Sequence, residues 1–286
     1  MNIIALGGAA CNVAKKFSKY SQYNLVYIDT KNNNHDGKNI VIKAQSSHQE
    51  YESNLEPLKF EIEDGDVLFL VCGAGNISGA TLKILEQIKE KLTNGIIDIL
   101  YIKPEENSLG LQAKLRHRLT FQVLQQYARS NALNKIYIVD NGMVEKISGN
   151  LSIKNYWDNI NEIIVTTYHM INVFSKTEPL LSTFTSSPPP ITAKICTLGV
   201  VDSKLEAEKT FYKLNYTRTK TYYFAISAKN LDSDKNLLHK IRNFVSNSGA
   251  EHTNVAFSIF STDYKSDYIY SVQYASYIQE QENLSL

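Results

Sequence analysis

The sequence has few cysteines and no pattern that would bind a metal. Cys11, Cys72 and Cys196 are the three cysteines of the 286-residue chain, and they are widely spaced. No C-x-x-C pair or Cys/His cluster accompanies them. Zinc sites and disulfide frameworks depend on such spacing, so the sequence argues against both and favours a reducing compartment.

Long hydrophobic runs and an excess of charge are also missing. No apolar run approaches the roughly 18 residues of a membrane helix. The N-terminus, MNIIALGG, lacks the basic lead and long apolar core of a signal peptide. Lys+Arg number 30 against 29 Asp+Glu, too balanced for binding nucleic acid through bulk positive charge. With 43% hydrophobic residues, we expect a soluble, cytoplasmic globular protein.

Two common nucleotide-binding motifs are absent. The P-loop pattern GxxxxGK[ST] does not occur, and Gly7-Gly8 continues as Ala-Ala-Cys-Asn rather than as GxGxxG. Asp29 follows Gly7 by 22 residues, about where a dinucleotide fold places its acidic ribose ligand. An NAD(P)-dependent oxidoreductase therefore stays open as an alternative.

The first half of the chain alternates between apolar runs and helical patterns. Continuous apolar runs of this kind predict the strands of a parallel sheet covered on both faces. The strands are expected at 2–6, 25–28, 66–72, 96–102 and 136–139. Helices are expected at 12–20, after 79, and at 109–127, the last with leucines at every fourth position.

The second half begins with the longest helical pattern, 153–174, followed by a Ser/Thr/Pro-rich linker up to 190. A second α/β unit follows, with strands at 193–200, 221–228, 254–261 and 268–277 and helices at 203–212 and 232–246. Residues 262–267 predict a hairpin between the last two strands. The predicted domains are 1–150 for nucleotide binding, 151–190 for the core helix and linker, and 191–286 for a smaller α/β domain.

Glycine-rich loops follow two of the predicted strands. In an open α/β sheet, ligands bind at the carboxyl ends of the strands, where backbone N–H groups at a helix start can hold phosphate. The residues of these two loops predicted to hold a nucleotide's phosphates are Gly7, Gly8, Asn12, Gly73, Ala74, Gly75, Asn76, Ser78 and Gly79.

Other reactive side chains have simpler interpretations. Cys11 is expected to be a small buried filler. His117, between two arginines, is expected on a solvated basic face, and His169 in a core or interface. Tyrosines at alternate positions near the C-terminus favour a packed or edge strand over a surface that stacks bases.

The order of these pieces resembles the tubulin/FtsZ superfamily. Gly7, Gly8 and Asn12 match that family's first nucleotide loop, and residues 73–79 look like its GGGTGTG phosphate loop with fewer glycines. Asn141, at the end of the fifth strand, and Glu162, in Asn-Glu-Ile-Ile, match its base-binding positions. The resemblance implies a Rossmann-like parallel-sheet domain, a long core helix and a smaller α/β domain.

Three departures bear on activity. The loop at 105–112 lacks the family's E-G-x-x-R pattern, and Arg116 is the nearest candidate for a phosphate or ribose contact. Glu162 replaces an Asp where guanine would be recognised. The stretch 175–190 holds a single acid, Glu178, in place of the acidic loop that activates water.

The resemblance thus implies a phage- or plasmid-type protein that binds GTP or GDP, with Mg²⁺ as companion ion, and assembles head to tail. Glu178 would be its only catalytic candidate, and hydrolysis is expected to be weak or absent. Self-association and an adaptor protein are the expected partners, without membrane or nucleic acid. A non-hydrolysing structural module of the same fold is the first alternative and an NAD(P)-dependent oxidoreductase the second. A carboxylate facing the phosphates should weaken GTP binding, so Gly79→Asp would test the phosphate loop.

Overall fold

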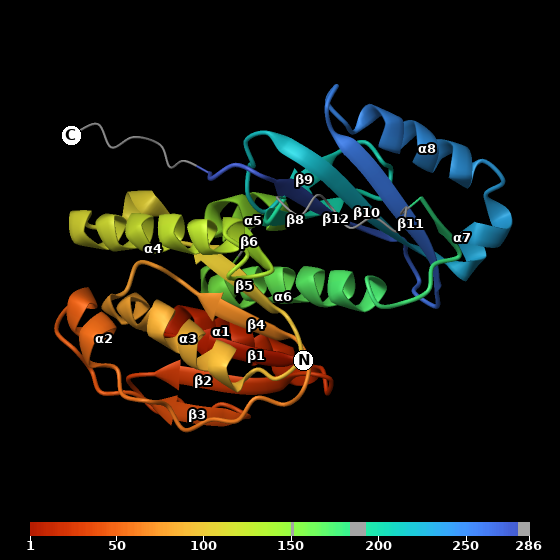
Figure 1. The fold of residues 1–286 in the computed structure, drawn as a ribbon. Coiled ribbons are helices and arrows are strands. Elements are labelled where there is room, and N and C mark those ends of the chain that lie inside the picture. Colours follow the sequence, from red (N-terminus) through yellow and green to blue (C-terminus); the bar gives the residue numbers. More distant parts are fainter. Residues whose placement is uncertain (150–151, 184–192, 280–286) are drawn as a thin grey trace. The chain divides into compact units, whose positions relative to one another are not determined.

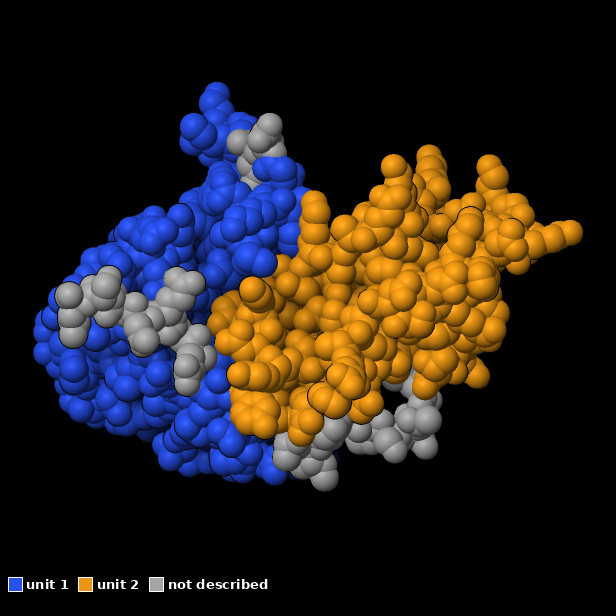
Figure 2. Space-filling view, turned by 90° about the horizontal axis from the view of Figure 1, so that it is seen from above, with its two compact units in different colours: residues 1–165, 278–286 blue, residues 166–277 orange. Residues whose placement is uncertain are grey.

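The computed structural model describes residues 1–149, 152–183 and 193–279. It divides into two compact units, Met1–Val165 with Ile278–Leu286, and Thr166–Tyr277 (Figure 2). The boundary falls inside the long helix α6 (Tyr156–Phe174). The three-part domain division made from the sequence stays a prediction.

Unit 1 is built on a six-stranded parallel sheet with strand order β3-β2-β1-β4-β5-β6 (Figure 1). Its strands are β1 (Asn2–Leu6), β2 (Asn24–Asp29), β3 (Lys38–Val41), β4 (Val67–Val71), β5 (Ile97–Lys103) and β6 (Lys135–Asp140). All residues of β1 and β4 are buried, as central strands covered on both faces must be. The parallel sheet expected from the sequence is confirmed.

Helices and short 3₁₀ turns connect these strands. They are α1 (Gly8–Lys15), η1 (Lys16–Lys19), α2 (His48–Asn54), η2 (Asn76–Ala80), α3 (Thr81–Lys91), η3 (Glu106–Ser108), α4 (Leu111–Arg129), α5 (Asn141–Ser148) and η4 (Ile153–Asn155). Strand β3 and helices α2 and α5 had not been predicted; β3 is only four residues long and has no buried residue.

Helix α4 presents a different face to the core than its leucine pattern suggests. Leu111, Leu115 and Leu119 are 58%, 48% and 54% exposed. The buried face instead combines three polar residues with three apolar ones: His117, Thr120 and Gln125, and Phe121, Leu124 and Ala128. The expected solvated position of His117 is therefore wrong, because its side chain is fully buried.

The C-terminal segment returns to this same helix. The Gln125 side chain is fully buried, and its Nε2 donates to the Gln279 carbonyl (3.2 Å). Its Oε1 accepts from the Gln279 backbone N–H (2.7 Å). One amide side chain thus satisfies both backbone groups of a buried residue.

Unit 2 contains a mixed sheet with order β8-β12-β10-β11-β7, and β9 pairs with β8. Its strands are β7 (Leu181–Ser182), β8 (Ile195–Val201), β9 (Glu208–Thr210), β10 (Thr217–Ser227), β11 (Asn254–Thr262) and β12 (Tyr268–Ala275). The predicted hairpin is wrong, because β10 lies between β11 and β12, parallel to the first and antiparallel to the second.

The helix predicted at 203–212 is also absent from unit 2. Its first residues form a turn around Asp202, whose carboxylate accepts the N–H groups of Lys204 (3.0 Å) and Ala207 (2.8 Å). Leu205 in this turn has φ +62°, which a helix cannot contain. Strand β9 follows directly. The chain from Glu208 to Thr210 thus pairs with β8 as a strand and does not form a helix.

The faces of the unit 2 sheet are covered by different helices. Helices α7 (Ala228–Ser233) and α8 (Leu237–Asn247) follow β10, and Phe244 of α8 packs on Tyr222 (5.2 Å between ring centroids). On the other face Phe174 of α6 packs on Phe260 (4.6 Å). The proline-rich part of the predicted linker lies outside the described residues. None of the described helices combines the length and apolar character needed to span a bilayer.

Candidate nucleotide site

The loop after β1 meets the loop after β4 at the carboxyl edge of the unit 1 sheet. Gly7 has φ +83°, which favours glycine, and its N–H donates to the Ile28 carbonyl (2.8 Å). A Cβ on Gly7 would lie 2.8 Å from Ile77 Cγ2, closer than real Cβ contacts allow. The structure therefore brings the two predicted phosphate loops together.

Helix α1 begins at this point without a side-chain cap. Gly8, Ala9 and Asn12 are exposed, whereas Ala10 and Cys11 are buried. First-turn N–H groups of a helix have no partner within it, so this exposed start can accept an anion. Burial raises the pKa of the Cys11 thiol to about 12, with Asp29 adding to the effect, and Cys11 is the buried filler that its position predicted.

The second loop is shaped by its own hydrogen bonds. Ser78 is 3% exposed, and its hydroxyl donates to the carbonyls of Gly73 (3.0 Å) and Gly75 (2.8 Å). Its side chain thus holds the turn and points away from solvent. Gly75 is exposed, no side chain caps η2, and Arg116 Nε donates to the Ala74 carbonyl (3.1 Å). The loop can therefore offer backbone N–H groups while Arg116 supports it from α4.

Two of the loop's glycines are required by packing. A Cβ on Gly73 would overlap the Tyr101 hydroxyl, and one on Gly79 would overlap the His48 carbonyl oxygen. Gly79→Asp would consequently disturb the contact with His48 before any phosphate is involved. Gly75 is the better site for a charge, because the nearest atom to its Cβ would be Ile77 Cγ2 at 3.7 Å.

A third loop at this edge had not been predicted. Asn76 Nδ2 donates to the Ser46 carbonyl (3.0 Å), which fixes the segment before α2 against the loop after β4. Ser47 caps α2 by accepting the Glu50 N–H (3.2 Å), and the Glu50 carboxylate accepts from the Ser46 hydroxyl (2.6 Å). Ser47-x-x-Glu50 is a capping-box pattern, a signal in the sequence that could have located this helix start.

Charged groups gather at the ends of β5 and β6. Lys103 Nζ lies 3.0 Å from Asp140 and 3.1 Å from Glu106. Burial works against its charge, but the two carboxylates raise the pKa of Lys103 above its ordinary value. Asp140 also caps α5 by accepting the Gly142 N–H (2.9 Å). This network fixes the start of α5, where the predicted base-binding Asn141 lies.

Asn141 carries an unsatisfied acceptor. Its Oδ1 is buried and has no hydrogen-bond partner among the residues that the structure describes. A buried acceptor of this kind is rare in native proteins and costs about 1–3 kcal/mol. A ligand with N–H donors would satisfy it.

Glu162 lies in an ion-pair ladder between α6 and the α1–η1 segment. Its carboxylate pairs with Lys19, and one helical turn earlier Asp158 pairs with Lys16. Lys16 follows Asn12 by four residues. Glu178 lies elsewhere: it is exposed in the loop after α6 and belongs to unit 2.

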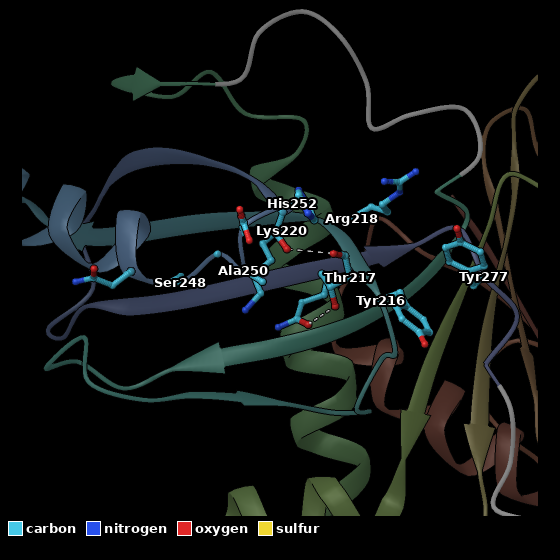
Figure 3. Close-up of a pocket in the computed structure, with 13 residues that line it drawn as sticks. Tyr216, Thr217, Arg218, Lys220, Ser248, Ala250, His252 and Tyr277 are labelled. Carbon is cyan, nitrogen blue, oxygen red and sulfur yellow. Dashed lines mark hydrogen bonds between the residues drawn. The ribbon is translucent and has the colours of Figure 1, made fainter.

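A cavity of about 780 Å³ in unit 2 lies where β10 and β11 begin. Tyr216 and Tyr277 stand at one end of it and Ser248 and Ala250 at the other (Figure 3). Several polar groups of its lining already have partners: Gln273 accepts from Thr217 Oγ1 (3.3 Å), and Lys220 Nζ pairs with Glu208 of strand β9 (2.9 Å). This network stabilises the sheet.

Comparison with known proteins rests on structure alone. No protein-family model and no curated protein matches the sequence. A GTPγS-form protofilament of TubZ from Bacillus thuringiensis serovar israelensis superposes with TM-score 0.71 at 14% identity, covering 96% of this chain and 86% of that one. The chain has the tubulin/FtsZ fold.

Other proteins with the tubulin/FtsZ fold match over similar lengths. CetZ2 from Haloferax volcanii, in a GTPγS-bound protofilament, gives TM-score 0.67 at 13% identity over 98% of this chain and 94% of that one. An empty FtsZ dimer from M. jannaschii gives 0.65 at 11% identity, over 96% and 87%. The predicted fold class is therefore confirmed.

Proposed function

We propose that this chain is a tubulin/FtsZ-type protein that binds guanine nucleotide in unit 1 and assembles head to tail into filaments, with weak or absent GTP hydrolysis. The observation that carries the proposal is the contact between two uncapped, glycine-containing loops at the carboxyl edge of a parallel sheet. Proteins of the same fold have been seen as GTPγS-form and GDP-form protofilaments.

The residues present fit a nucleotide's phosphates. Gly8 and Ala9 expose the start of α1, and Ala74, Gly75 and Asn76 form the second cradle. Gly73, Ser78 and Gly79 belong to the proposed site as the residues that hold the cradle in shape. When bound, GTP would supply the phosphoric anhydride and Mg²⁺ would offset its charge.

The base would lie beside Asn141. Guanine carries an N–H and an amino donor on its Watson–Crick edge, which suit an acceptor that lacks a partner. The Asn12 face of α1 continues into the Lys16–Asp158 and Lys19–Glu162 pairs. Glu162 would therefore act at the base with its carboxylate already neutralised by Lys19.

Hydrolysis would depend on Glu178. It is exposed in the loop after α6, and the resemblance to the tubulin/FtsZ superfamily implies that it would orient water at the nucleotide of a neighbouring subunit. A single carboxylate should orient the attacking water poorly. We expect Glu178→Ala to abolish the part of the GTP turnover that depends on protein concentration.

The first experiment measures GTP turnover across a protein-concentration series, with light scattering on the same samples. Turnover that rises together with scattering would identify a hydrolysing filament. GTP binding without turnover would favour the non-hydrolysing structural module. Failure to bind GTP would contradict the proposal.

A pair of charge-introducing variants tests whether the loop at residues 73–79 binds phosphate, independently of the effect of an added negative charge elsewhere. Gly75→Asp should weaken GTP binding at least tenfold, because a carboxylate about 5 Å from a phosphate costs roughly 3 kcal/mol at an effective dielectric of 20. Thr93→Asp makes the same charge change at an exposed residue between α3 and β5, at the amino ends of the strands, and serves as the control. Equal affinities for the two variants would contradict the assignment.

A second pair of variants tests the base. Asn141→Ala should lower GTP affinity about tenfold, whereas Asn141→Asp keeps an acceptor and should bind within a few-fold of the native protein. The affinity for ATP should be the same in the Asn141→Ala and Asn141→Asp variants. If the two variants bind GTP equally, Asn141 does not read the base.

The oxidoreductase alternative rests on Asp29, whose Oδ2 would lie 3.6 Å from a Cβ on Gly8. This carboxylate is engaged by its own loop, accepting from the Thr30 N–H (2.8 Å) and Asn33 Nδ2 (3.1 Å). Tight NAD(P) binding together with absent GTP binding would favour that alternative. A cytoplasmic location, a phage or plasmid origin and an adaptor protein stay predictions.

A further inference from the structure

A small cavity of about 100 Å³ lies between α2, α3 and α4 of unit 1. Its walls are mainly apolar, with Leu82 from α3 and Leu119, Val123 and Leu124 from α4. Ser78 and Gly79, at the end of the phosphate loop, close one side. The cavity is therefore separate from the exposed starts of α1 and η2.

The polar atom that distinguishes this cavity belongs to His48. The side chain lines the cavity and is 9% exposed, and its Nε2 is buried without a hydrogen-bond partner in the described chain. The hydroxyls that line the cavity are already used: Thr81 donates to the Ser78 carbonyl (2.6 Å), Ser78 donates within its own loop, and Thr120 donates to Ser78 Oγ (3.5 Å). An unsatisfied ring nitrogen against an apolar cavity is what a ligand would complete.

Burial of the His48 imidazole favours its neutral form. Burial lowers the pKa of His48, the charge of Arg116 acts in the same direction, and Glu52 at the cavity wall opposes them. A neutral imidazole nitrogen either donates or accepts, depending on the tautomer. A hydroxyl group can meet either need, whereas an amide or a carboxylate cannot enter such a cavity without leaving polar atoms unpaired.

We propose that this cavity binds a small neutral molecule with a compact apolar body and one hydroxyl group, of the phenol class, hydrogen-bonded to His48 Nε2. A dry cavity of about 150 Å³ lined by aliphatic and aromatic side chains binds benzene. The smaller volume here sets a single ring as the upper limit, and the edge of that ring would extend past Leu119, which is 54% exposed. The ring would pack on Leu119 and Val123 and the hydroxyl would face His48.

Binding of this ligand should perturb the phosphate loop at residues 73–79 even when no nucleotide is present. It would contact Ser78, whose hydroxyl bonds to the carbonyls of Gly73 and Gly75. Backbone amides between Gly73 and Gly79 should therefore shift on binding. This inference does not depend on the proposed function, because the test uses nucleotide-free protein.

The experiment is an NMR titration of the full chain with phenol, and with benzene for comparison. We expect saturable shifts of the 73–79 amides and the His48 ring, and phenol affinity about tenfold above that of benzene. Val123→Phe should abolish binding by filling the cavity. Leu115→Phe, two turns earlier on α4 and outside the cavity, should leave it unchanged. His48→Leu should bring phenol down to the affinity of benzene.

Several results would overturn the inference. Phenol binding that survives Val123→Phe would place the ligand elsewhere, and equal affinities for phenol and benzene in the native protein would remove the role of His48. Shifts that do not saturate would mean binding at assay concentration only. If His48→Leu fails to fold, His48→Gln keeps a polar group, and an affinity for phenol no higher than for benzene there would count against the proposal.

Discussion

Protonation of His117 should destabilise unit 1 in mildly acidic solution. The imidazole is fully buried against Tyr101, whose hydroxyl lies 2.6 Å from Nδ1. Burial lowers its pKa to about 4; Lys103 and Arg118 act in the same direction, and Glu106 and Asp140 oppose them. The unfolded chain takes up this proton near pH 6.5, and the folded chain only near pH 4. Between these values the unfolded state holds more protons, so the free energy of unfolding falls as the pH falls.

The expected loss follows from that difference in pKa. A difference of about 2.5 units corresponds to roughly 3 kcal/mol, fully present above pH 6.5 and lost by about pH 4. The measurement is urea unfolding of unit 1 at steps from pH 7.5 to 4, followed by far-UV circular dichroism.

The matched variant is His117→Asn, which offers Tyr101 an acceptor but takes up no proton. It should be less stable than the native protein at pH 7.5 and should lose about 3 kcal/mol less on acidification. His252→Asn changes an exposed histidine and should leave the native pH profile unaltered. A profile for His117→Asn as steep as the native one would refute the reasoning, because the other histidines would then carry the dependence.

Three further predictions concern a buried amide, a crowded glycine and a buried ion pair. Gln125→Ala should lower the free energy of unfolding of unit 1 by about 3 kcal/mol, because the two backbone groups of buried Gln279 lose their hydrogen bonds to this side chain. The exposed Gln126→Ala is the control and should change the free energy of unfolding by less than about 0.5 kcal/mol. Gly73→Ala should destabilise by about 2 kcal/mol because its Cβ would overlap Tyr101, but Gly110→Ala, with open space around it, should be neutral; equal unfolding midpoints in urea would contradict this. Glu208→Ala should lower the free energy of unfolding of unit 2 by about 3 kcal/mol in the same assay, because the partly buried Lys220 would lose its paired carboxylate. The exposed Glu206→Ala is the control and should have little effect.

The sequence predicts the unit 1 sheet well because its strands are continuous apolar runs. Such runs must be buried on both faces by helices, so the parallel direction of the strands could be predicted, whereas their order in the sheet was not predicted. The short edge strand β3 gives no such signal, because half of its residues are exposed and none is buried.

Prediction failed where polar groups are buried in pairs. A periodic stripe of leucines on α4 suggested the core-facing side, yet His117 and Gln125 face inward because Tyr101 and Gln279 satisfy them. The partner of each lies far away in the sequence or on another element, so hydrophobic periodicity cannot reveal it. The same limit explains the hairpin error: β10 enters between β11 and β12 through long-range pairing that the local turn signal does not contain.

The residues of the proposed site fall into two kinds. Some glycines are required because neighbouring atoms leave no room for a Cβ, and other groups remain available to a ligand. Gly7, Gly73 and Gly79 are enclosed by Ile77, Tyr101 and His48, so their small size is already accounted for by packing. Gly8, Gly75 and the Asn141 acceptor have no such explanation within the protein, because the first two are exposed and the third lacks a partner among the described residues. A glycine count in a motif therefore overstates how many residues touch phosphate. Substitution of Gly8 or Gly75 should therefore change nucleotide affinity with little change in stability, whereas substitution of Asn141 should change both, because its unpaired acceptor also costs the folded protein free energy.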